Sequence, residues 1–398
     1  MTTILLSAGD QSGEMHGAAL VRKLRERFPE ARFVGLGGDA MRAAGVDVGV
    51  DQRELAVGGL VEVASSLPRV RRALRALLDV ALRTRPDLVI LIDSGGFNLL
   101  FARALRRQRR IVPTLYYIAP QVWAWRPKRV QKLAERADRI AVILPFERAF
   151  YASRGIEVDF VGHPSLDGHA ALTHRETGEA RAALGRTLGI PEGVPLLGIF
   201  PGSRRNEWVR HLPVQLEAFA ELRERGGAAA EMHAVVGLAP SLARSEIEAA
   251  IADCQALDRS GAREVLHLGE AGDERVLPAL DLALAKPGTI TVEAMLQGLP
   301  MVVIAKGHPL SAWVARRAVQ VDWLAMPNLI AGEQIVPELI QEEATPDRIA
   351  AELAPLLGGA ARDAQVAALA QAKRALGEPG ASSRVAQIVE EMLETDHA

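Results

Sequence analysis

The sequence predicts an α/β protein with two doubly wound parallel sheets in tandem, followed by helices. Short continuous apolar runs, typical of parallel strands covered on both faces, alternate with amphipathic helical segments. The alternation restarts after a polar stretch at 168–195, and from about Thr345 Ala and Leu recur at helical spacing without a strand. We therefore expect domains at 1–167 and 168–345, and C-terminal helices at 346–398.

Each expected domain opens with a strand, a glycine-rich turn and a helix. In the first domain the strand is at 3–7 and the helix runs from Met15 to Phe28; in the second the strand is at 196–200 and a helix follows from about Leu212. Further strands are expected at 32–36, 88–92, 114–118 and 139–143, and then at 232–236, 265–268, 281–285 and 301–304. Ligands of such folds bind beyond the carboxyl ends of the strands, so we expect the active site in a cleft between the two domains.

The composition excludes several classes of protein. Apolar residues make up 49% of the chain and charged residues 24%, which excludes a disordered tail protein, a collagen and a small disulfide-stapled protein. A single cysteine, Cys254, cannot form an internal disulfide and indicates a reducing compartment. The sequence has no run of 18 apolar residues, so we expect no transmembrane helix, and its start lacks the features of a signal peptide.

The charges are distributed unevenly along the chain. Residues 1–170 carry 26 Lys and Arg against 18 Asp and Glu, a net charge of +8, whereas the remainder carries 21 against 31, a net charge of −10. An anionic partner of the basic half could be a nucleic acid or an anionic lipid surface. The alternative is that these charges lie on solvated helix faces.

The first glycine-rich loop, Gly9–Glu14, matches neither a dinucleotide-binding fingerprint nor a Walker loop. It places two acidic residues, Asp10 and Glu14, and a hydroxyl, Ser12, at the start of a helix. These groups are candidates for contact with a substrate. The alternative is that Asp10 and Ser12 cap the helix and complement its dipole.

Two loops of the second domain are suited to a nucleotide. Gly202, Ser203 and Arg204 lie between a strand and a helix, where backbone N–H groups bind phosphate and Arg204 can add a bidentate contact; Arg205 is the alternative. The loop at 286–293 has a helix start after Gly288, with Thr289 as its expected cap and Glu293 on the same helix face, where its carboxylate could accept ribose hydroxyls. A plain capping motif is the alternative there. Because no Asp-rich cluster accompanies the loops, we expect no metal.

Aromatic and apolar residues of the first domain suggest a lipid-facing surface. Trp123 and Trp125 lie two residues apart before a basic segment, and they form either an acceptor wall, a membrane-interface anchor or part of the core. The apolar stretch 55–64, which includes Val61, precedes several arginines and resembles a segment that lies on a membrane; the alternative is a buried strand followed by a solvated helix. His163, after an apolar strand near the domain junction, could bind a phosphate or serve the structure.

These motifs together resemble the lipid-A-disaccharide synthase family, whose members are glycosyltransferases with two Rossmann-like domains in the GT-B arrangement. The matching stretches are A-G-D-Q-S-G-E-M-H-G-A near the start, Y-I-A-P-Q-V-W-A-W-R-P-K-R-V at 117, I-L-P-F-E at 143, F-V-G-H-P at 160, F-P-G-S-R at 200, K-P-G-T-I-T-V-E at 286 and M-P-N-L-I-A-G-E-Q-I-V-P-E-L-I-Q at 326. They occur in the family's order and span nearly the whole chain.

The resemblance implies the transfer of a 2,3-diacylglucosamine unit from UDP to 2,3-diacylglucosamine 1-phosphate. The reaction inverts the configuration at the anomeric carbon, forms a β-1,6 bond and requires no metal or other cofactor. It takes place at the cytoplasmic face of the inner membrane, so the expected partners include anionic lipids but no nucleic acid. The resemblance also implies that the C-terminal helices pack back on the N-terminal domain. Nothing in the sequence defines an oligomeric state.

The resemblance assigns candidate residues to each step. Arg204, with Gly202 and Ser203, would bind the pyrophosphate; Gly288, Thr289 and Ile290 would add backbone groups, and Glu293 and Asn328 would fix ribose or uracil. Asp93, with Asp10 and Glu14, would activate or orient the acceptor. The remaining residues expected to face the acceptor or the lipid are Ser12, Val61, Asn98, Trp123, Trp125, Arg126 and His163.

Two departures from the family pattern concern the acidic residues. The family commonly reads A-G-E-x-S-G-D at the first loop, whereas here the two acids are exchanged as Asp10 and Glu14. The family also reads I-D-x-P-D-F-N where this chain has Ile92–Asn98, and the second Asp, its proposed base, is replaced by Gly96. An attacking alcohol needs a base, so Asp93 is the nearest remaining candidate. The alternatives are another GT-B enzyme acting on a UDP-sugar, such as a 2-epimerase, and a non-catalytic paralogue that binds a nucleotide-sugar or a lipid.

Overall fold

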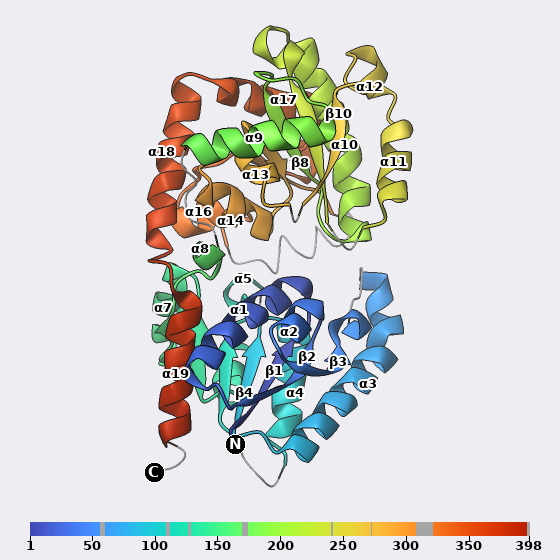
Figure 1. Ribbon diagram of the computed structural model, residues 1–398. Coiled ribbons are helices and arrows are strands. Elements are labelled where there is room, and N and C mark those ends of the chain that lie inside the picture. Colours follow the sequence, from blue (N-terminus) through green and yellow to red (C-terminus); the bar gives the residue numbers. More distant parts are fainter. Residues whose placement is uncertain are drawn as a thin grey trace. The chain divides into compact units, whose positions relative to one another are not determined.

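The chain folds into two compact units, each built on a parallel sheet (Figure 1). The first unit comprises residues 1–168 and 376–398, and the second comprises residues 169–375. The computed structural model describes residues 1–55, 60–108, 112–125, 129–168, 174–239, 242–271, 273–307 and 321–395. Each unit is described by itself.

The first unit contains a seven-stranded sheet in the order β3-β2-β1-β4-β5-β6-β7. Its strands are β1 (Thr3–Ala8), β2 (Arg32–Gly37), β3 (Asp47–Asp51), β4 (Leu88–Ile92), β5 (Thr114–Tyr117), β6 (Arg139–Val142) and β7 (Asp159–Phe160). The five strands expected from the sequence are present. The short strand β7 corresponds to the apolar strand expected just before His163. The edge strand β3 was not predicted, because it has an acidic residue at each end and mostly exposed or half-buried side chains.

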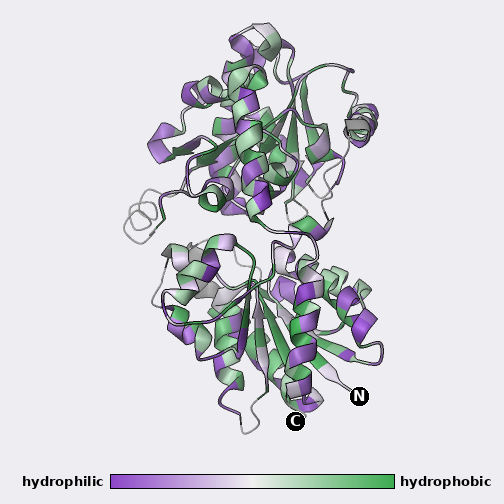
Figure 2. Cartoon of the chain, turned by 90° about the vertical axis from the view of Figure 1, so that its left-hand side faces the viewer, coloured by the Kyte–Doolittle hydropathy of each residue, from purple (hydrophilic) through white to green (hydrophobic). Residues whose placement is uncertain are grey.

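Helices cover both faces of this sheet. They are α1 (Gln11–Arg27), α2 (Asp39–Ala43), α3 (Leu60–Thr84), α4 (Gly95–Leu105), α5 (Val122–Trp125), α6 (Val130–Ala134), α7 (Pro145–Ala152), α8 (Ser165–Gly168) and α19 (Ala381–Thr395), with a 3-10 turn η1 at Gln52–Leu55. Alternate residues of β1 point to opposite faces: Leu5 packs with residues of α3 and α4, whereas Ile4 and Leu6 pack with residues of α1 and α19. Figure 2 shows the apolar strands between these helix layers.

The second unit contains a six-stranded sheet in the order β10-β9-β8-β11-β12-β13. Its strands are β8 (Leu196–Phe200), β9 (His233–Leu238), β10 (Leu266–Glu270), β11 (Leu282–Ala285), β12 (Met301–Ala305) and β13 (Glu338–Ile340). Its helices are α9 (His174–Leu188), α10 (Arg205–Glu224), α11 (Arg244–Ala252), α12 (Ala256–Arg259), α13 (Val276–Ala279), α14 (Thr289–Leu296), α16 (Met326–Ala331), α17 (Pro346–Leu353) and α18 (Ala360–Ala375), with 3-10 turns at Gly227–Glu231, Gln341–Glu343 and Ala354–Leu357. The predicted strands of this unit are present, and the three-residue edge strand β13 is an addition.

Helix α10 begins at Arg205, seven residues before the expected start near Leu212. Pro213, a residue type favoured in the first turn of a helix, lies inside this helix. The early start has a consequence for the site, because it places Arg204 at the N-cap position of α10, directly before the helix.

The expectation that residues 346–398 pack together on the N-terminal domain is wrong for two of the three helices. Helices α17 and α18 belong to the second unit, where Ile349 and Leu353 of α17 fill the same core as residues of α10. Only α19 lies in the first unit, where Val385 and Val389 pack with residues of α1. Asp167 fixes its start, because its carboxylate accepts the backbone N–H groups of residues 380, 381 and 382 at 2.6–3.0 Å.

Candidate active site

The switch point of the first sheet lies between β1 and β4, because the chain winds outward from these two neighbouring strands in opposite directions. Their last residues, Ala8 and Ile92, are paired in register, so the segments that follow them emerge side by side. Such a switch point is the usual ligand site of a doubly wound sheet. The sequence-predicted residues Asp10 and Asp93 both follow these strand ends.

Asp10 is held by two hydrogen bonds. One carboxylate oxygen accepts the N–H of Gly13 at 2.8 Å, and so caps α1 as the capping alternative predicted. The other oxygen accepts the hydroxyl of Ser94 at 2.9 Å. Asp10 is half-buried and therefore combines a structural contact with a carboxylate placed at the switch point.

Asp93 and Ser94 have a left-handed backbone conformation, with φ values of 47° and 45°. Residues other than glycine rarely adopt this conformation, and it occurs often at functional sites. Two side chains hold the backbone oxygen of Asp93: the hydroxyl of Tyr116 donates to it at 2.7 Å and the amide of Asn98 at 3.0 Å. The strained turn is thus fixed by the buried hydrogen-bond donors of Tyr116 and Asn98.

Asn98, expected to face the acceptor, is instead fully buried and serves the structure. Its amide nitrogen donates to the backbone oxygens of Ser7, Ile92 and Asp93 at 2.9–3.1 Å, and its oxygen accepts the hydroxyl of Ser7 at 2.6 Å. Asn98 therefore ties the ends of β1 and β4 together. It acts on the site only by positioning Asp93.

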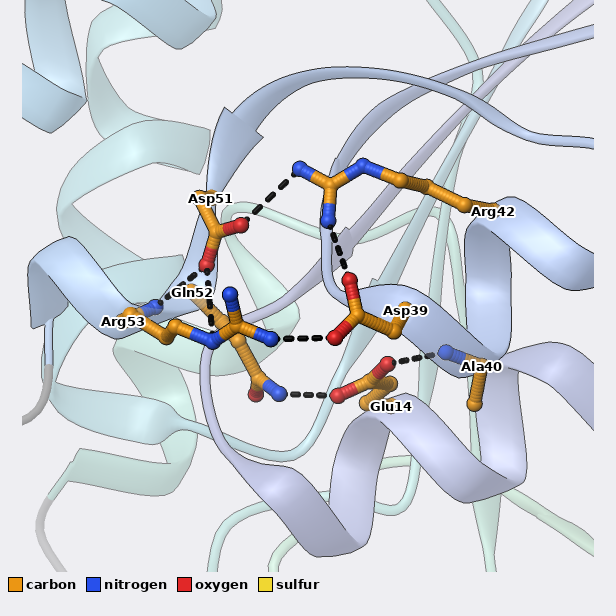
Figure 3. Close-up of polar contacts among 7 residues, drawn as sticks. All are labelled: Glu14, Asp39, Ala40, Arg42, Asp51, Gln52 and Arg53. Carbon is orange, nitrogen blue, oxygen red and sulfur yellow. Dashed lines mark hydrogen bonds and ion pairs between the residues drawn. The ribbon is translucent and has the colours of Figure 1, made fainter.

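Glu14, expected as a catalytic acid or base, is buried with both carboxylate oxygens bonded (Figure 3). One oxygen accepts the N–H of Ala40 at 2.6 Å, in the first turn of α2, and the other accepts the side-chain amide of Gln52. Glu14 therefore caps α2 and fixes the start of η1. This geometry leaves Asp10 and Asp93 as the predicted carboxylates at the switch point.

A ring of two acids and two arginines lies beside this contact (Figure 3). Arg42 lies 2.9 Å from both Asp39 and Asp51, and Arg53 contacts the same two acids. Burial acts to raise the pKa of Asp51, but its hydrogen bonds to Arg53 and Arg42 outweigh this and lower it. Because the four charges balance, the ring fixes η1 rather than offering a net charge to a ligand.

Gly96, which stands where the family pattern has its proposed base, is exposed in the first turn of α4. A Cβ added at this position would meet nothing within 4 Å. The neighbouring Gly95 differs, because a Cβ there would lie 2.5 Å from the ring of Pro120. A side chain is therefore sterically possible at position 96 and obstructed at position 95.

Trp123, expected to line the acceptor or anchor the chain to a membrane, is buried and belongs to the core. Its indole N–H donates to Glu147 at 3.0 Å, and its ring packs edge-on against Phe146 at 4.8 Å. Burial raises the pKa of Glu147 to about 7, although the backbone N–H groups of Leu144 and Ile143 and the Trp123 indole favour the charged form. The side chains of Trp125 and Val61, and the whole of Arg126, lie outside the described residues.

Ser12, expected near the acceptor, is half-buried on α1, and its hydroxyl lies 3.5 Å from Nε2 of His16. Burial lowers the pKa of His16 to about 4, against the opposing charges of Asp10 and Asp167. His16 is therefore neutral at pH 7 and lies near the Asp10 carboxylate. His16 was not among the predicted site residues, because a single histidine on an amphipathic helix does not by itself indicate a functional site.

His163 is buried, and its Nδ1 accepts the N–H of Ser165 at 3.2 Å. Its own backbone N–H donates to the oxygen of Leu376 at 3.3 Å. These contacts match the structural alternative for His163. They help to join α8 to the segment that leads into α19.

The switch point of the second sheet lies between β8 and β11, where Phe200 and Ala285 are paired in register. The two loops predicted to bind a nucleotide, at 201–204 and 286–288, follow these strands and therefore lie side by side. Gln215 of α10 is fully buried and donates to the oxygen of Leu284 at 3.1 Å, beneath this edge. Gln215 thus supports the second switch point as Asn98 supports the first.

Glu207 occupies the start of α10. Its carboxylate accepts the backbone N–H groups of Ser203 at 3.1 Å and Arg204 at 3.3 Å. The tight approach requires a glycine at 202, where φ is +112° and a Cβ would lie 2.6 Å from a Glu207 oxygen. The expectation that Ser203 offers its N–H group to a phosphate is therefore not met, because Glu207 already accepts it.

Two cations contact the Glu207 carboxylate: Nζ of Lys286 at 3.1 Å and the guanidinium of Arg204 at 3.3 Å. Burial acts to raise the pKa of Glu207, but the charge of Lys286 and the further contacts lower it below its usual value. Glu207 is thus ionised at neutral pH. The side chain of Arg204 is 57% exposed, which leaves most of its guanidinium accessible to an anion.

His211 links α10 to the end of β12. Its Nδ1 lies 2.8 Å from the backbone oxygen of Glu207, and its Nε2 accepts the backbone N–H of Lys306 at 2.9 Å. These two contacts fix the neutral tautomer that carries its hydrogen on Nδ1. Burial, together with the charges of Lys286 and Lys306, lowers the pKa of His211. Lys286, Glu207 and His211 were not among the predicted site residues, because their grouping depends on contacts such as that between Lys286 and Glu207, which are 79 positions apart.

Helix α14 starts at Thr289, so Gly288 rather than Thr289 occupies the cap position. The hydroxyl of Thr291 donates to the oxygen of Gly288 at 2.7 Å, and so does its backbone N–H at 3.1 Å. Thr289 is exposed, and Ile290 and Glu293 are half-buried. The start of α14 therefore lies at the switch point with Thr289 exposed and Ile290 partly accessible, whereas Thr291 is buried.

Asn328, expected to fix ribose or uracil, is fully buried and bonded within the fold. Its amide donates to the oxygen of Val336 at 2.9 Å and to Glu338 at 2.7 Å, and its oxygen accepts the N–H groups of Ile335 and Val336. All its donor and acceptor groups are used to fold the segment after α16. Asn328 therefore does not serve as a ligand contact.

Within the described ranges, no group of three or more His, Cys, Asp or Glu side chains could hold a metal ion. Among the same residues, no helix is long and apolar enough to cross a membrane.

A family model described as lipid-A-disaccharide synthetase matches residues 4–392. The chain belongs to the lipid-A-disaccharide synthetase family. It is 42% identical over 391 residues to the lipid-A-disaccharide synthase of Geobacter sulfurreducens, covering 98% of this chain and 97% of that protein. It is 37% identical over 392 residues to that of Myxococcus xanthus, with the same coverage. The resemblance stated from the motifs is thus confirmed.

Solved structures agree with the fold of the family. The UDP complex of MnaA from S. aureus aligns with a TM-score of 0.65 at 14% identity, covering 99% of this chain and 97% of that one. The calicheamicin glycosyltransferase CalG4 aligns with a TM-score of 0.59 at 17% identity, covering 99% and 98%. These similarities support two Rossmann-like domains of the GT-B class, and with the family match they make this lipid-A-disaccharide synthetase family member a glycosyltransferase of lipid A synthesis.

Proposed function

We propose that the chain transfers a 2,3-diacylglucosamine unit from UDP to 2,3-diacylglucosamine 1-phosphate, with inversion, to form a β-1,6-linked disaccharide 1-phosphate and UDP. The observation that carries the proposal is the family match over residues 4–392, because it includes the loops at both switch points. The acceptor hydroxyl attacks the anomeric carbon, the bond from that carbon to the UDP oxygen breaks, and UDP leaves with the electron pair. The hydroxyl proton passes to a carboxylate.

In this proposal Asp93 is the base and Asp10 orients the acceptor. Asp93 stands on the strained turn at the end of β4, and Asp10 is fixed by Ser94 and Gly13. Glu14 is removed from the catalytic set, because the N–H of Ala40 and the amide of Gln52 already use its carboxylate. Serine and acidic side chains at this edge favour a sugar hydroxyl as their ligand.

The donor binds at the switch point of the second unit. Arg204 contacts the pyrophosphate, the first turn of α14 at Thr289 and Ile290 offers backbone N–H groups, and Glu293 accepts ribose hydroxyls. Charge on the departing UDP is stabilised by these groups rather than by a metal.

The first unit also carries the lipid-facing surface in this proposal. In the described part of α3, Leu67 is 47% exposed, and Arg69, Arg71 and Arg72, which follow it, are also exposed. An exposed apolar side chain before a basic run suits an anionic bilayer surface. We therefore propose peripheral attachment to the cytoplasmic face of the inner membrane, through this segment together with Val61, Trp125 and Arg126.

A radiolabelled-donor assay tests the function. The acylated monosaccharide 1-phosphate and the UDP-linked donor, presented in detergent micelles, should yield a labelled disaccharide phosphate and one UDP per bond formed. The proposal fails if no UDP is released in any detergent. Turnover of UDP-N-acetylglucosamine without an acceptor would indicate an epimerase instead.

Gly96 favours a second candidate, a paralogue that binds the nucleotide-sugar or the lipid without turnover. It would bind UDP in calorimetry and release none from the donor. The substitution Gly96→Asp separates this candidate from the first.

A further inference from the structure

Lys286 lies at the end of β11, between the starts of two helices. Its Nζ lies 3.1 Å from the Glu207 carboxylate, which caps α10, and 3.8 Å from the point where a Gly288 Cβ would stand, at the cap of α14. Its side chain is 25% exposed, whereas that of Arg204 is 57% exposed. The Lys286 ammonium is therefore the more closely held of the two cations at this switch point.

Two backbone donors of the first loop are already in use. Glu207 accepts the N–H groups of both Ser203 and Arg204, so these groups are not available to a phosphate. The cations at this edge that can bind an anion in their place are Arg204 and Lys286, next to the first turn of α14. Such an anion would also lie near the ionised carboxylate of Glu207, and that repulsion has to be neutralised.

We infer that Lys286 contacts the diphosphate of the nucleotide-sugar donor and stabilises the charge of the departing UDP. The inference rests on the proposed function and adds to it a second diphosphate-binding cation. Glu207 positions Lys286, because the ion pair holds the ammonium at the switch point. Lys286 at the same time screens the diphosphate from Glu207, so its removal both deletes a contact and exposes a like charge.

The test compares UDP with uridine, which lacks the diphosphate. In Lys286→Met the dissociation constant of UDP, measured by calorimetry at fixed salt, should rise about tenfold or more, the scale of one charge-assisted hydrogen bond. The inhibition constant of uridine in competition with UDP should stay within about twofold, because no charge is involved. Lys286→Arg should recover most of the UDP affinity, because the cation is retained.

The matched control is Lys373→Met. Lys373 of α18 donates to the backbone oxygen of Leu296 at 2.7 Å, so this variant removes an ammonium that contacts the C-terminal end of α14, away from the switch point. Its UDP affinity should equal that of the wild-type chain.

The outcomes separate the inference from the proposed function. If the wild-type chain binds no UDP, the proposed function itself fails. If it binds UDP, an unchanged UDP affinity in Lys286→Met overturns the inference. An equal loss of UDP and uridine affinity also overturns it, since Lys286 would then only hold the fold of the loop. If the Met variant does not fold, Lys286→Gln, which also removes the charge, takes its place in the same comparison.

Discussion

Ser94 donates its hydroxyl hydrogen to Asp10 at 2.9 Å, and this bond joins the two loops at the switch point of the first sheet. The two residues are 84 positions apart in the sequence and follow different strands. The buried Asn98 side chain donates to the backbone at the ends of both strands. In the second unit, Gln215 donates to the end of β11, and the Glu207–Lys286 pair joins the two loops of that switch point. In each unit, therefore, a buried side-chain amide supports the switch point, and charged side chains lie on the loops that follow the strands.

Asp93→Asn should slow turnover without weakening UDP binding. The amide keeps the shape of the side chain but cannot accept the acceptor proton, so we expect a loss in kcat of about 10²–10⁴-fold. The matched control is Glu14→Gln, because Glu14 caps α2 and has no part in proton transfer. This control should lower the thermal midpoint and leave kcat within about threefold; the assignment is wrong if the two variants lose activity equally.

Gly96→Asp tests whether the chain lacks a base. The position is exposed in the first turn of α4 and open around its Cβ, so the variant should fold and the new carboxylate should suit the helix dipole. If Asp93 already takes the proton, kcat should rise less than about tenfold, since a base adds its full effect only where none acts. Gly96→Asn, which matches the shape without the charge, controls for the lost glycine. A gain of about 10² or more in the Asp variant alone would support the non-catalytic candidate for the native chain.

Arg204→Ala should weaken UDP binding by about 1.5–3 kcal/mol, the scale of a hydrogen bond between charged groups. The neighbouring Arg205 provides the control: it is 73% exposed and lies 3.4 Å from Glu246, away from Glu207. Arg205→Ala should leave UDP affinity unchanged in calorimetry. The opposite pattern would assign the pyrophosphate contact to Arg205, the alternative weighed from the sequence.

The sequence was sufficient for the fold because buried parallel strands are continuous apolar runs, such as 88–92 and 196–200, and these do not depend on distant residues. It was insufficient for short edge strands such as β13, which has three residues and little apolar surface to signal it. It also misplaced α17 and α18, since an amphipathic helix does not encode which core it covers.

The positions of the loops at the site could be predicted from the sequence, but the hydrogen-bond partners of their side chains could not. The Gly9 and Gly202 loops were correctly located, because a strand followed by a small-residue turn and a helix defines a switch-point loop. Glu14, Asn98 and Asn328 were assigned to ligands, but each is bonded inside the fold to backbone groups between 5 and 91 positions away. A polar residue in a family motif can hold the loop as readily as it holds the substrate, and the sequence does not distinguish the two.

The pH dependence of stability should carry a contribution from His16. Burial lowers its pKa in the folded chain to about 4, whereas the unfolded chain titrates near 6.5. Between these values the unfolded state binds more protons, so the contribution is fully present above pH 6.5 and is lost as the pH falls toward 4. Integration over this interval gives a loss of about 2.5 kcal/mol at pH 4.5.

The wild-type curve alone would conceal this effect, because Glu147 acts in the opposite direction. Its pKa is raised to about 7, so its contribution to stability falls as the pH rises from about 4.5 through 7. The measurement is therefore a difference: urea unfolding of the wild-type chain and of His16→Gln at pH 4.5, 5.5, 6.5 and 7.5. The free energy of unfolding of the wild type minus that of the variant should fall by about 2.5 kcal/mol from the highest to the lowest pH, since Glu147 is common to both. Parallel curves would mean that His16 titrates normally and is not held neutral beside Asp10.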